Sequence, residues 1–456
     1  MLAETRIKQD TGYAWFVAII LCLCNACSIM DRSVLSLLVH PLEKSMGLTD
    51  TSIGLLQGAA FGVTFGIVGL PLARLADNGH RRNIIIIGVV AWSLATMGCG
   101  FARTLPELFI GRMCVGIGEA LLMPSAVSIL SDYFSTRRRT RAISLNSMGV
   151  YLGSGLSLLA GGTLIRMLGA DSVARTFVGP LETWRIVFIL IGLSGFLLIP
   201  LLLAVKEPER LSNDGVSASA KTSFADVLVI FREKRVALFS VIMGFATLVL
   251  AHHAVIAWAP TLFVRAHGMD LAKTGQTLGL VNLVMSPLGV ITGAFLSEVL
   301  DSRWNRRDGK LIVGIVSGLL CAAAAFMVTI LFKNGALIAF AVLQFAVTFN
   351  FGLTHATLAE LLPNRVRAFG AACFIAASNI YAATLGPLSV GLLDDQVFHD
   401  QAQLALSIRW ISPLAFLLGA GILAMGLKPF RAATIQPAGA GRDPAPLAYA
   451  VAEAAS

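Results

Sequence analysis

Long apolar segments separated by short polar loops follow one another along the chain. A helix needs roughly 20 mostly apolar residues to cross a bilayer, whereas barrel strands are short and alternate in polarity. The pattern therefore predicts twelve transmembrane helices. Their expected bounds are 13–39, 51–76, 83–102, 105–130, 141–168, 184–205, 236–264, 272–299, 311–332, 335–360, 367–392 and 408–429.

The longest polar connection divides these spans into two groups of six. Residues 206–235 contain a Ser, Gly and Ala stretch, which is typical of a linker. We expect an N-terminal six-helix bundle over 1–205, a cytoplasmic linker over 206–235 and a C-terminal six-helix bundle over 236–430. The Ala-, Pro- and Gly-rich residues 431–456 are expected to form a disordered cytoplasmic tail.

Composition excludes the soluble classes of protein. Of the 456 residues, 56% are hydrophobic and 13% are charged, against about 25% charged in an ordinary soluble domain. Such a chain has too little polar surface for a soluble fold of this size. A cytosolic enzyme, a disordered chain and a secreted disulfide scaffold are therefore excluded, and an all-α integral membrane protein remains.

The position of the basic residues predicts the topology. Lys and Arg number 35 against 26 Asp and Glu, and most of the basic residues lie near the termini and in the alternate loops on the same side. Because cytoplasmic loops are enriched in Lys and Arg, we expect both termini to be cytoplasmic, in a bacterial inner membrane. No basic and aromatic module accompanies these residues, so nucleic acid is not an expected partner.

Cysteines and short motifs give no sign of a metal, a cofactor or an enzyme. All seven cysteines fall inside predicted spans, so disulfides are not expected, and the CxxC of Cys24 and Cys27 has no partner pair. We find no clustered His, no nucleophile with a base and no GxxxxGK[ST] loop for ATP. Residues 1–12 are polar and do not resemble a cleavable signal peptide.

The two halves of the chain repeat a short loop motif. Its copies are Asp77, Arg81 and Arg82 after the second span, and Asp301, Arg306 and Arg307 after the eighth. A second pair of copies is Asp132 with Arg141 after the fourth span and Glu360 with Arg367 after the tenth. Parallel halves related by an axis along the membrane normal are typical of transporters, with a central site between them.

We expect these loop charges to control gating. Asp77 can accept hydrogen bonds from Arg141 or from backbone amides at a neighbouring helix N-terminus, which would stabilise the outward-open state. Asp301 with Arg306 and Arg307 repeats this arrangement, and Arg81, Arg82 and Asp132 belong to the same set. The alternative is that the loop charges only set the topology.

The loop from Asp77 to Arg82 resembles the signature of the major facilitator superfamily between its second and third helices, although Asn78 stands where a basic residue is usual. More narrowly, the N-terminal half resembles the Spinster-like transporters. The residues that carry this resemblance are Met30-Asp31-Arg32, Arg112 to Glu119, Gly153-Ser154-Gly155 and Lys206-Glu207-Pro208. It implies the major facilitator fold, with two pseudo-symmetric six-helix bundles and alternating access.

Four ionisable residues lie at bilayer depth, all in the N-terminal half: Asp31, Arg32, Arg112 and Glu119. Such residues cost roughly 2.5–3.5 kcal/mol each on insertion scales, so they usually face a cavity and act. We expect Asp31 or Glu119 to gain a proton on one side of the membrane and lose it on the other. Arg32 or Arg112 would hold the acid in one state and bind an anionic substrate in another. A static ion pair that fixes helix packing is the alternative.

The C-terminal half offers no matching acid, since Val255 occupies the position equivalent to Asp31. It supplies neutral polar and aromatic groups instead. We expect the substrate cavity to be lined, besides the two arginines, by Tyr151, Trp258, Asn282, Asn350 and Tyr381.

We therefore expect a monomeric, proton-coupled secondary transporter surrounded by membrane lipids. The ion-rich N-terminal half and the neutral C-terminal half suit an amphiphile with an anionic head, and the Spinster resemblance implies lysophospholipid- or sphingolipid-like substrates. One alternative is a proton-coupled symporter of a small organic anion such as a carboxylate or a sugar acid. Another is a non-transporting membrane sensor, which an added signalling domain would favour.

Overall fold

Twelve membrane-spanning segments make up the fold. The computed structural model describes residues 10–170, 172–176, 179–208, 224–303 and 308–435. Within these residues, twelve segments are long and apolar enough to cross a membrane, which confirms the predicted number. The segments are Gly12–Leu37, Asp50–Gly69, Arg81–Cys99, Leu105–Tyr133, Arg137–Leu168, Thr183–Leu203, Arg235–Arg265, Leu271–Ser302, Gly309–Ile330, Lys333–Leu361, Phe369–Phe398 and Gln401–Thr434.

Within its described residues, the N-terminal half consists of ten helices and a hairpin. Thr11 and Thr104 begin two of its spans, because each threonine hydroxyl accepts a hydrogen bond from an amide in the first helical turn. The helices are α1 (Gly12–Leu37), α2 (Val39–Met46), α3 (Asp50–Gln57), α4 (Ala59–Asn78), α5 (Arg81–Cys99), α6 (Leu105–Glu119), α7 (Leu122–Tyr133), α8 (Thr136–Leu168), α9 (Thr183–Phe196) and α10 (Leu198–Leu203). Between α8 and α9, strand β1 (Val173–Thr176) pairs antiparallel with β2 (Gly179–Glu182).

The C-terminal half contains further helices with several irregular turns. Pro387 cannot donate an amide hydrogen to the carbonyl of Ala383, and the chain before it widens into the π-helix η2. The elements are α11 (Phe224–Glu233), α12 (Arg235–Ile256), α13 (Ala259–Arg265), α14 (Leu271–Arg303), α15 (Gly309–Ile330), α16 (Lys333–Val347), η1 (Thr348–Asn350), α17 (Leu353–Leu361), α18 (Asn364–Ala376), η2 (Ala377–Ala383), α19 (Thr384–Leu393), η3 (Asp394–Phe398), η4 (Gln401–Gln403) and α20 (Leu404–Ile435).

Helical structure extends into two segments for which we expected none. The predicted linker contains α11, where the ring of Phe231 packs against Phe369 with centroids 5.3 Å apart. Helix α20 continues to Ile435, past the expected start of the tail, because Arg431 donates to Asp308 at 2.5 Å and ties this last turn to the bundle. The rest of the predicted tail lies outside the described residues.

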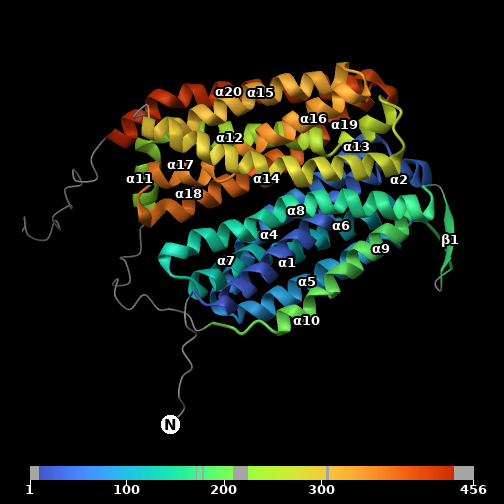
Figure 1. The fold of residues 1–456 in the computed structure, drawn as a ribbon, viewed down its shortest axis with the longest axis horizontal. Coiled ribbons are helices and arrows are strands. Elements are labelled where there is room, and N and C mark those ends of the chain that lie inside the picture. The colour runs from blue at the N-terminus through green and yellow to red at the C-terminus, as the bar shows by residue number, and fades with distance from the viewer. Residues whose placement is uncertain (1–9, 171, 177–178, 209–223, 304–307, 436–456) are drawn as a thin grey trace, which may run out of the picture.

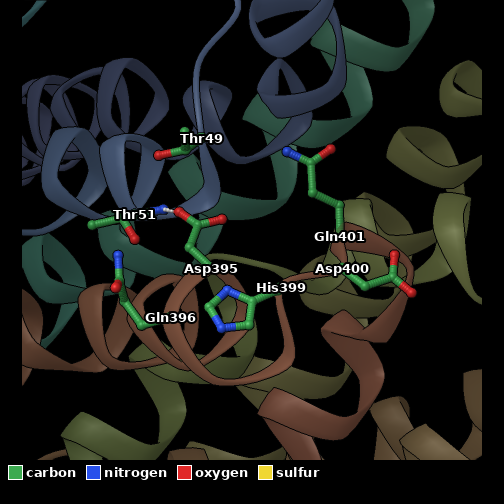
Figure 2. Close-up of a pocket in the computed structure, with 7 residues that line it drawn as sticks. All are labelled: Thr49, Thr51, Asp395, Gln396, His399, Asp400 and Gln401. Atoms are coloured by element: carbon green, nitrogen blue, oxygen red, sulfur yellow. Dashed lines mark hydrogen bonds between the residues drawn. The ribbon is translucent and has the colours of Figure 1, made fainter.

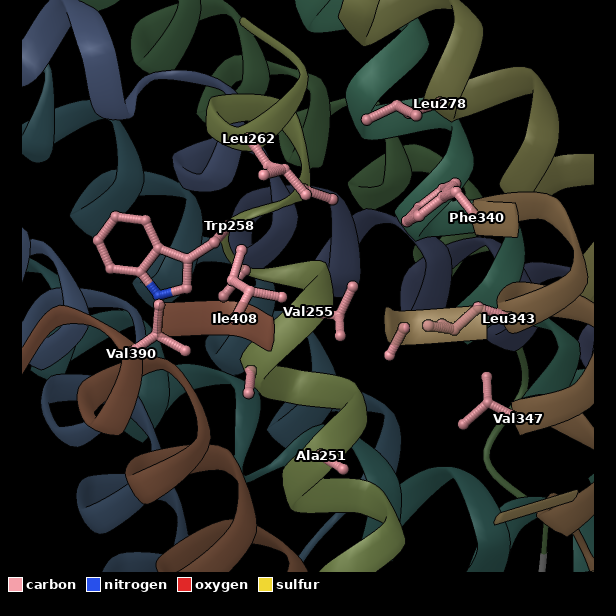
Figure 3. Close-up of a cluster of buried hydrophobic side chains, with 14 of the residues drawn as sticks. Ala251, Val255, Trp258, Leu262, Leu278, Phe340, Leu343, Val347, Val390 and Ile408 are labelled. Carbon is pink, nitrogen blue, oxygen red and sulfur yellow. The ribbon is translucent and has the colours of Figure 1, made fainter. Parts of the chain in front are cut away.

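The two halves lie side by side as two bundles of roughly parallel helices (Figure 1). We call the end that carries β1 and β2 the hairpin end, and the opposite end, where α1 begins and α20 finishes, the linker end. The largest cluster of buried apolar side chains crosses from one half to the other. It includes Leu38 and Trp184 of the N-terminal half and Trp258 and Leu262 of the C-terminal half, the last two shown in Figure 3.

Glycines allow the backbones of the two halves to touch. A Cβ at Gly155 of α8 would lie 2.9 Å from the carbonyl oxygen of Gly279 in α14. On the other side of the molecule, a Cβ at Gly58, between α3 and α4, would lie 2.5 Å from the carbonyl oxygen of Thr384 in α19. Small residues at such contacts let transmembrane helices approach closely. The state described here therefore has its halves in direct contact along two separate helix pairs.

We expect Gly58→Val to weaken the closed state of the hairpin end. The valine Cβ would overlap the Thr384 carbonyl, and overpacking of this kind costs about 1–3 kcal/mol, or about a 5- to 150-fold change in the equilibrium between two states. The measurement is double electron–electron resonance between spin labels at H40C and V397C, two exposed positions on opposite halves. Gly98→Val is the matched control, since nothing lies within 4 Å of a Cβ there. Identical distance distributions for the two variants would refute the prediction.

Candidate functional site

The structure brings together the four charged residues expected at bilayer depth, at the contact between α1 and α6. The Arg32 guanidinium donates from Nη2 to Glu119 Oε2 at 2.7 Å. Arg112 donates from Nη1 to the backbone carbonyl of Asp31 at 2.9 Å. Asp31, Arg112 and Glu119 are buried, whereas the Arg32 side chain is 25% exposed. Arg32 is therefore the member of the cluster with the most accessible side chain.

Several polar atoms of this cluster are buried without a hydrogen-bond partner among the described residues. They are both carboxylate oxygens of Asp31, Oε1 of Glu119, Nε of Arg32, and Nε and Nη2 of Arg112. Buried polar groups in proteins are almost always hydrogen-bonded, because an unmade bond in an apolar setting is costly. The cluster thus has spare capacity to bind a proton or the polar head of a ligand.

Aromatic rings hold the Arg32 guanidinium in place. Its Cζ lies 3.7 Å from the centroid of the Phe61 ring and 5.6 Å from that of Phe65, both on α4. A guanidinium over an aromatic face gains about 0.5–2 kcal/mol, more when it is shielded from water. The Arg32 guanidinium is therefore held against an apolar wall while it also donates to Glu119.

The fourth span breaks next to Glu119. Helix α6 ends at this residue and α7 begins at Leu122. Pro124 cannot donate an amide hydrogen to the carbonyl of Ala120, so the regular helix is interrupted one turn before the proline. The break provides a point at which the two parts of the span can change their relative angle.

Asn282 belongs to a chain of polar side chains that links the two halves. Gln344 donates to Asn282 at 2.7 Å, and Asn282 donates to Ser154 of α8 at 3.3 Å. His252 Nε2 lies 3.0 Å from the Gln344 side-chain oxygen. Asn282 is 1% exposed, so it joins helices in this state rather than lining an open cavity.

The remaining residues that we expected around the cavity are more scattered. Trp258 does not line a cavity here: it is fully buried, and its Nε1 donates to the Pro387 carbonyl at 3.0 Å. Tyr151 is half-buried and its ring meets the edge of Phe351, with centroids 5.1 Å apart. The other two, Asn350 and Tyr381, are half-buried and lie near Ser317 and Thr247 respectively.

At the linker end, Arg81 is the centre of a buried contact. It pairs with Asp132, donates to Glu207 at 2.7 Å and donates to the Pro208 carbonyl at 2.7 Å. Burial would raise the pKa of Glu207, but the backbone amide of Arg82 and the Arg81 guanidinium together hold that pKa below its usual value. These contacts tie α5 and α7 to the segment that leaves the N-terminal half.

The other predicted gating residues are only partly described. Arg141 is exposed, and the side chain of Asp77 lies outside the described part, as do Arg306 and Arg307. Asp301 has a different partner from those expected, since Lys310 donates to it at 2.8 Å. Nζ of Lys310 also lies 2.7 Å from Oε1 of Glu360. This lysine therefore joins Asp301 and Glu360, the acids of the two repeated motifs in the C-terminal half.

An ion cluster that we did not predict lies at the hairpin end. Arg265 of α13 donates to Glu43 at 2.5 Å and to Asp50 at 3.0 Å, and so joins the two halves. The backbone amide of Thr51 donates to Asp395 at 2.7 Å beside it (Figure 2). An arginine directly after the seventh span and an aspartate before the second were a possible signal, since both fall where two spans end together.

The polar contacts that the structure describes between the halves lie at the hairpin end and towards mid-depth. They involve Arg265, Thr51, the pair Gln276 and Thr163, and the pair Asn282 and Ser154. The described state is therefore closed at the hairpin end, in agreement with the apolar cluster that crosses there.

Comparison with known proteins identifies the family. The model of the Major Facilitator Superfamily matches residues 21–387. An MFS-type efflux pump of Mycolicibacterium smegmatis is 25% identical over 86% of this chain and 87% of that protein. Protein spinster homolog 1 of Rattus norvegicus is 25% identical over 92% of this chain and 80% of that protein.

A solved structure has the same fold. The crystal structure of a bacterial homolog to the human lysosomal transporter Spinster, in an inward-facing and unoccupied conformation, superposes with a TM-score of 0.73. It covers 93% of this chain and 98% of its own, at 22% sequence identity. The chain thus belongs to the Major Facilitator Superfamily and is a non-enzymatic membrane transporter with similarity to the Spinster proteins.

Proposed function

We propose that the protein is a proton-coupled transporter of an amphiphilic anion, with Arg32 as the contact for the anionic head and Asp31 and Glu119 as the proton-carrying groups. The observation that carries this proposal is the arrangement at Arg32. The guanidinium is part-exposed, lies on Phe61 and is shared with a fully buried Glu119. An anion that binds Arg32 must compete with the Glu119 carboxylate for the same donor.

This competition gives a physical basis for coupling. When the anion displaces Glu119, the carboxylate loses its charged partner at a depth where a lone ion is costly. Taking up a proton removes that cost, so anion binding favours proton binding at the same site. Asp31 lies beside it with both carboxylate oxygens unpartnered among the described residues, and it offers a second place for the proton.

The wall of the site and the relatives both support an amphiphilic anion as the proposed substrate. Phe61 and Phe65 provide an apolar surface directly beside the cation, which suits a head group with an attached alkyl chain. The resemblance to Spinster proteins supports lysophospholipid- or sphingolipid-type substrates. Because the basic loops lie at the linker end, we infer that this end faces the cytoplasm of a bacterium.

The test is transport into liposomes with an imposed pH gradient, using a radiolabelled lysophospholipid. The wild-type protein should transport faster with the gradient than without it, and Asp31→Asn or Glu119→Gln should lose that acceleration. Glu107→Gln is the matched control, since this glutamate lies on the same helix as Glu119 but is exposed. If both variants keep the full response to the gradient, the assignment of the proton-carrying groups is wrong.

Competition experiments separate the substrate classes. Unlabelled lysophospholipids and sphingoid phosphates should inhibit uptake of the probe, whereas short carboxylates and sugar acids should not. Inhibition by the short anions at comparable concentrations would instead favour a symporter of small organic anions.

A further inference from the structure

At the hairpin end, three carboxyl groups surround a single guanidinium. Arg265 of α13 donates to Glu43 of α2 at 2.5 Å, and donates to both oxygens of Asp50 in α3 at 3.0 and 3.1 Å. Asp394 of η3 is the third acid, with Oδ2 4.0 Å from Nη1 of Arg265. Because Glu43 and Asp50 belong to one half and the other two residues to the other half, the cluster must come apart when this end opens.

The cluster is buried and carries too few positive charges. The side chains of Asp50 and Asp394 are 0% exposed, that of Glu43 is 8% and that of Arg265 is 12% exposed. The ion pairs described for these three acids all go to Arg265. If every acid were ionised, the four groups together would carry a charge of −2. Burying like charges beside one another without compensation is strongly unfavourable.

One atom of the cluster shows where compensation is missing. Asp394 Oδ1 accepts a hydrogen bond from Ser407 at 3.1 Å, but its Oδ2 is buried and has no hydrogen-bond partner among the residues described. This oxygen is the one that lies towards Arg265. A proton on Asp394 or on Asp50 would remove one negative charge from the cluster. It would also supply the hydrogen-bond donor that is missing at Asp394 Oδ2.

The charged groups that the structure describes next to the cluster are either acidic or exposed, and Lys44, which follows Glu43, is one of the exposed ones. Asp395 adds a further carboxylate, which accepts from the Thr51 amide. His399 and Asp400 are exposed and line the neighbouring polar pocket of about 480 Å³ (Figure 2). Because the His399 side chain is exposed to solvent, its charge is screened from the buried acids.

We propose that this hairpin-end gate, made of Glu43, Asp50, Arg265 and Asp394, binds at least one proton when it closes and releases it when it opens. The pH on that side of the membrane then sets how readily the transporter opens there. This proton site is separate from Asp31 and Glu119 and needs no substrate, so it does not depend on the proposed function.

The sign of the effect follows from the state of the acids. In the closed gate, burial raises the pKa of Glu43 to about 8, and the neighbouring Asp50 adds to this rise. In the open gate the same side chain faces water, where a glutamate has a pKa of about 4.3. The closed gate is therefore stabilised at low pH, and it loses that advantage as the pH rises from about 4.3 to 8. For each proton bound, the change is up to tenfold per pH unit.

The experiment measures gate closure directly, without substrate. Spin labels at H40C and V397C, in a background with C114S and C373S, report the distance across the hairpin end in nanodiscs at pH 5 to 9. In the parent protein the closed population should fall as the pH rises. The double variant E43Q/D394N mimics the protonated acids, and we expect it to stay closed over the whole range. D400N is the matched control, since it removes a nearby exposed carboxylate, and it should respond as the parent does.

Two results would overturn the proposal. The first is a pH response of E43Q/D394N equal to that of the parent. The second is a closed population that is insensitive to pH but changes when NaCl or CaCl₂ is titrated at constant pH, which would make the ligand a metal cation. E43D keeps a titratable group at the same place, so it should keep the pH response. A retained response in E43D would show that the amide variants do not lose theirs through a folding defect. Failure of gradient-driven transport in Asp31 or Glu119 variants would not bear on these outcomes.

Discussion

Arg32→Ala should lower the rate of substrate transport by about a hundredfold or more. Removing one partner of a buried ion pair costs about 3–5 kcal/mol, because the remaining charge is left without compensation. Here the stranded group is Glu119, which is fully buried and receives its described ion pair from Arg32. The same change also removes the proposed contact for the anionic head of the substrate. Substrate binding should therefore weaken, and the return of the substrate-free transporter should slow.

The loss can be assigned to charge or to geometry with a small set of variants, each measured by initial rates in proteoliposomes. Arg32→Lys keeps the charge but not the planar group that lies over Phe61, and should retain an intermediate rate. The double change R32A/E119Q removes the stranded charge, so it should restore thermal stability without restoring transport. Arg103→Ala, at an exposed position before α6, serves as the control. If Arg32→Ala transports at the wild-type rate, Arg32 is not the contact for the substrate.

Arg81→Ala should destabilise the protein by about 3–5 kcal/mol, the usual cost of breaking a buried ion pair. The Arg81 side chain is 1% exposed and holds Asp132 and Glu207 together at the linker end. Its loss leaves two carboxylates close to each other without their shared cation. Thermal and denaturant unfolding of the purified protein measure the effect. Arg82→Ala is the matched control: its guanidinium contacts Asn83 and the Val205 carbonyl, so a loss within about 1 kcal/mol is expected.

This contact also has a defined pH dependence. Because the folded protein holds the pKa of Glu207 below its usual value, the stabilisation is complete above about pH 4.3 and is lost as the pH falls through the lowered value. Arg81→Ala should reduce this acid sensitivity, while the backbone amide of Arg82 keeps part of it. An unchanged unfolding profile between pH 3 and 6 in the variant, relative to the parent, would contradict the assignment.

The spans and the charged site at bilayer depth could be predicted because each depends on local sequence. The fourth span was expected at 105–130 and is found at Leu105–Tyr133, since its limits follow from apolar length alone. An ion pair between an arginine and an acid at this depth was expected, because lone charges there are costly and usually pair with one another. The sequence left open which arginine pairs with which acid, and the structure pairs Arg32 with Glu119. The sequence did not reveal that Arg32 would lie on Phe61, which depends on how α4 packs.

The hairpin-end gate could not be predicted in the same way. Arg265 and Asp50 are 215 positions apart, and both lie at span ends, where charges are usual and do not attract notice. Their contact depends on how the two halves tilt towards each other. The same holds for Trp258, whose aromatic ring at a span end fits a cavity wall or a packed interface equally well, and only the packing decides between them.

The glycine contact between α8 and α14 has a mechanical consequence. Both helices are 33 residues long and unbroken, and they meet backbone to backbone at Gly155 and Gly279. Because the backbones approach so closely here, this seam can act as the pivot about which one bundle tilts against the other, flanked by the side-chain bonds between Asn282 and Ser154 and between Gln276 and Thr163. The helices that part to admit the substrate would then be those opposite this pivot, and the angle through which the transporter can rock would be limited by the close backbone contact and by the side chains beside it.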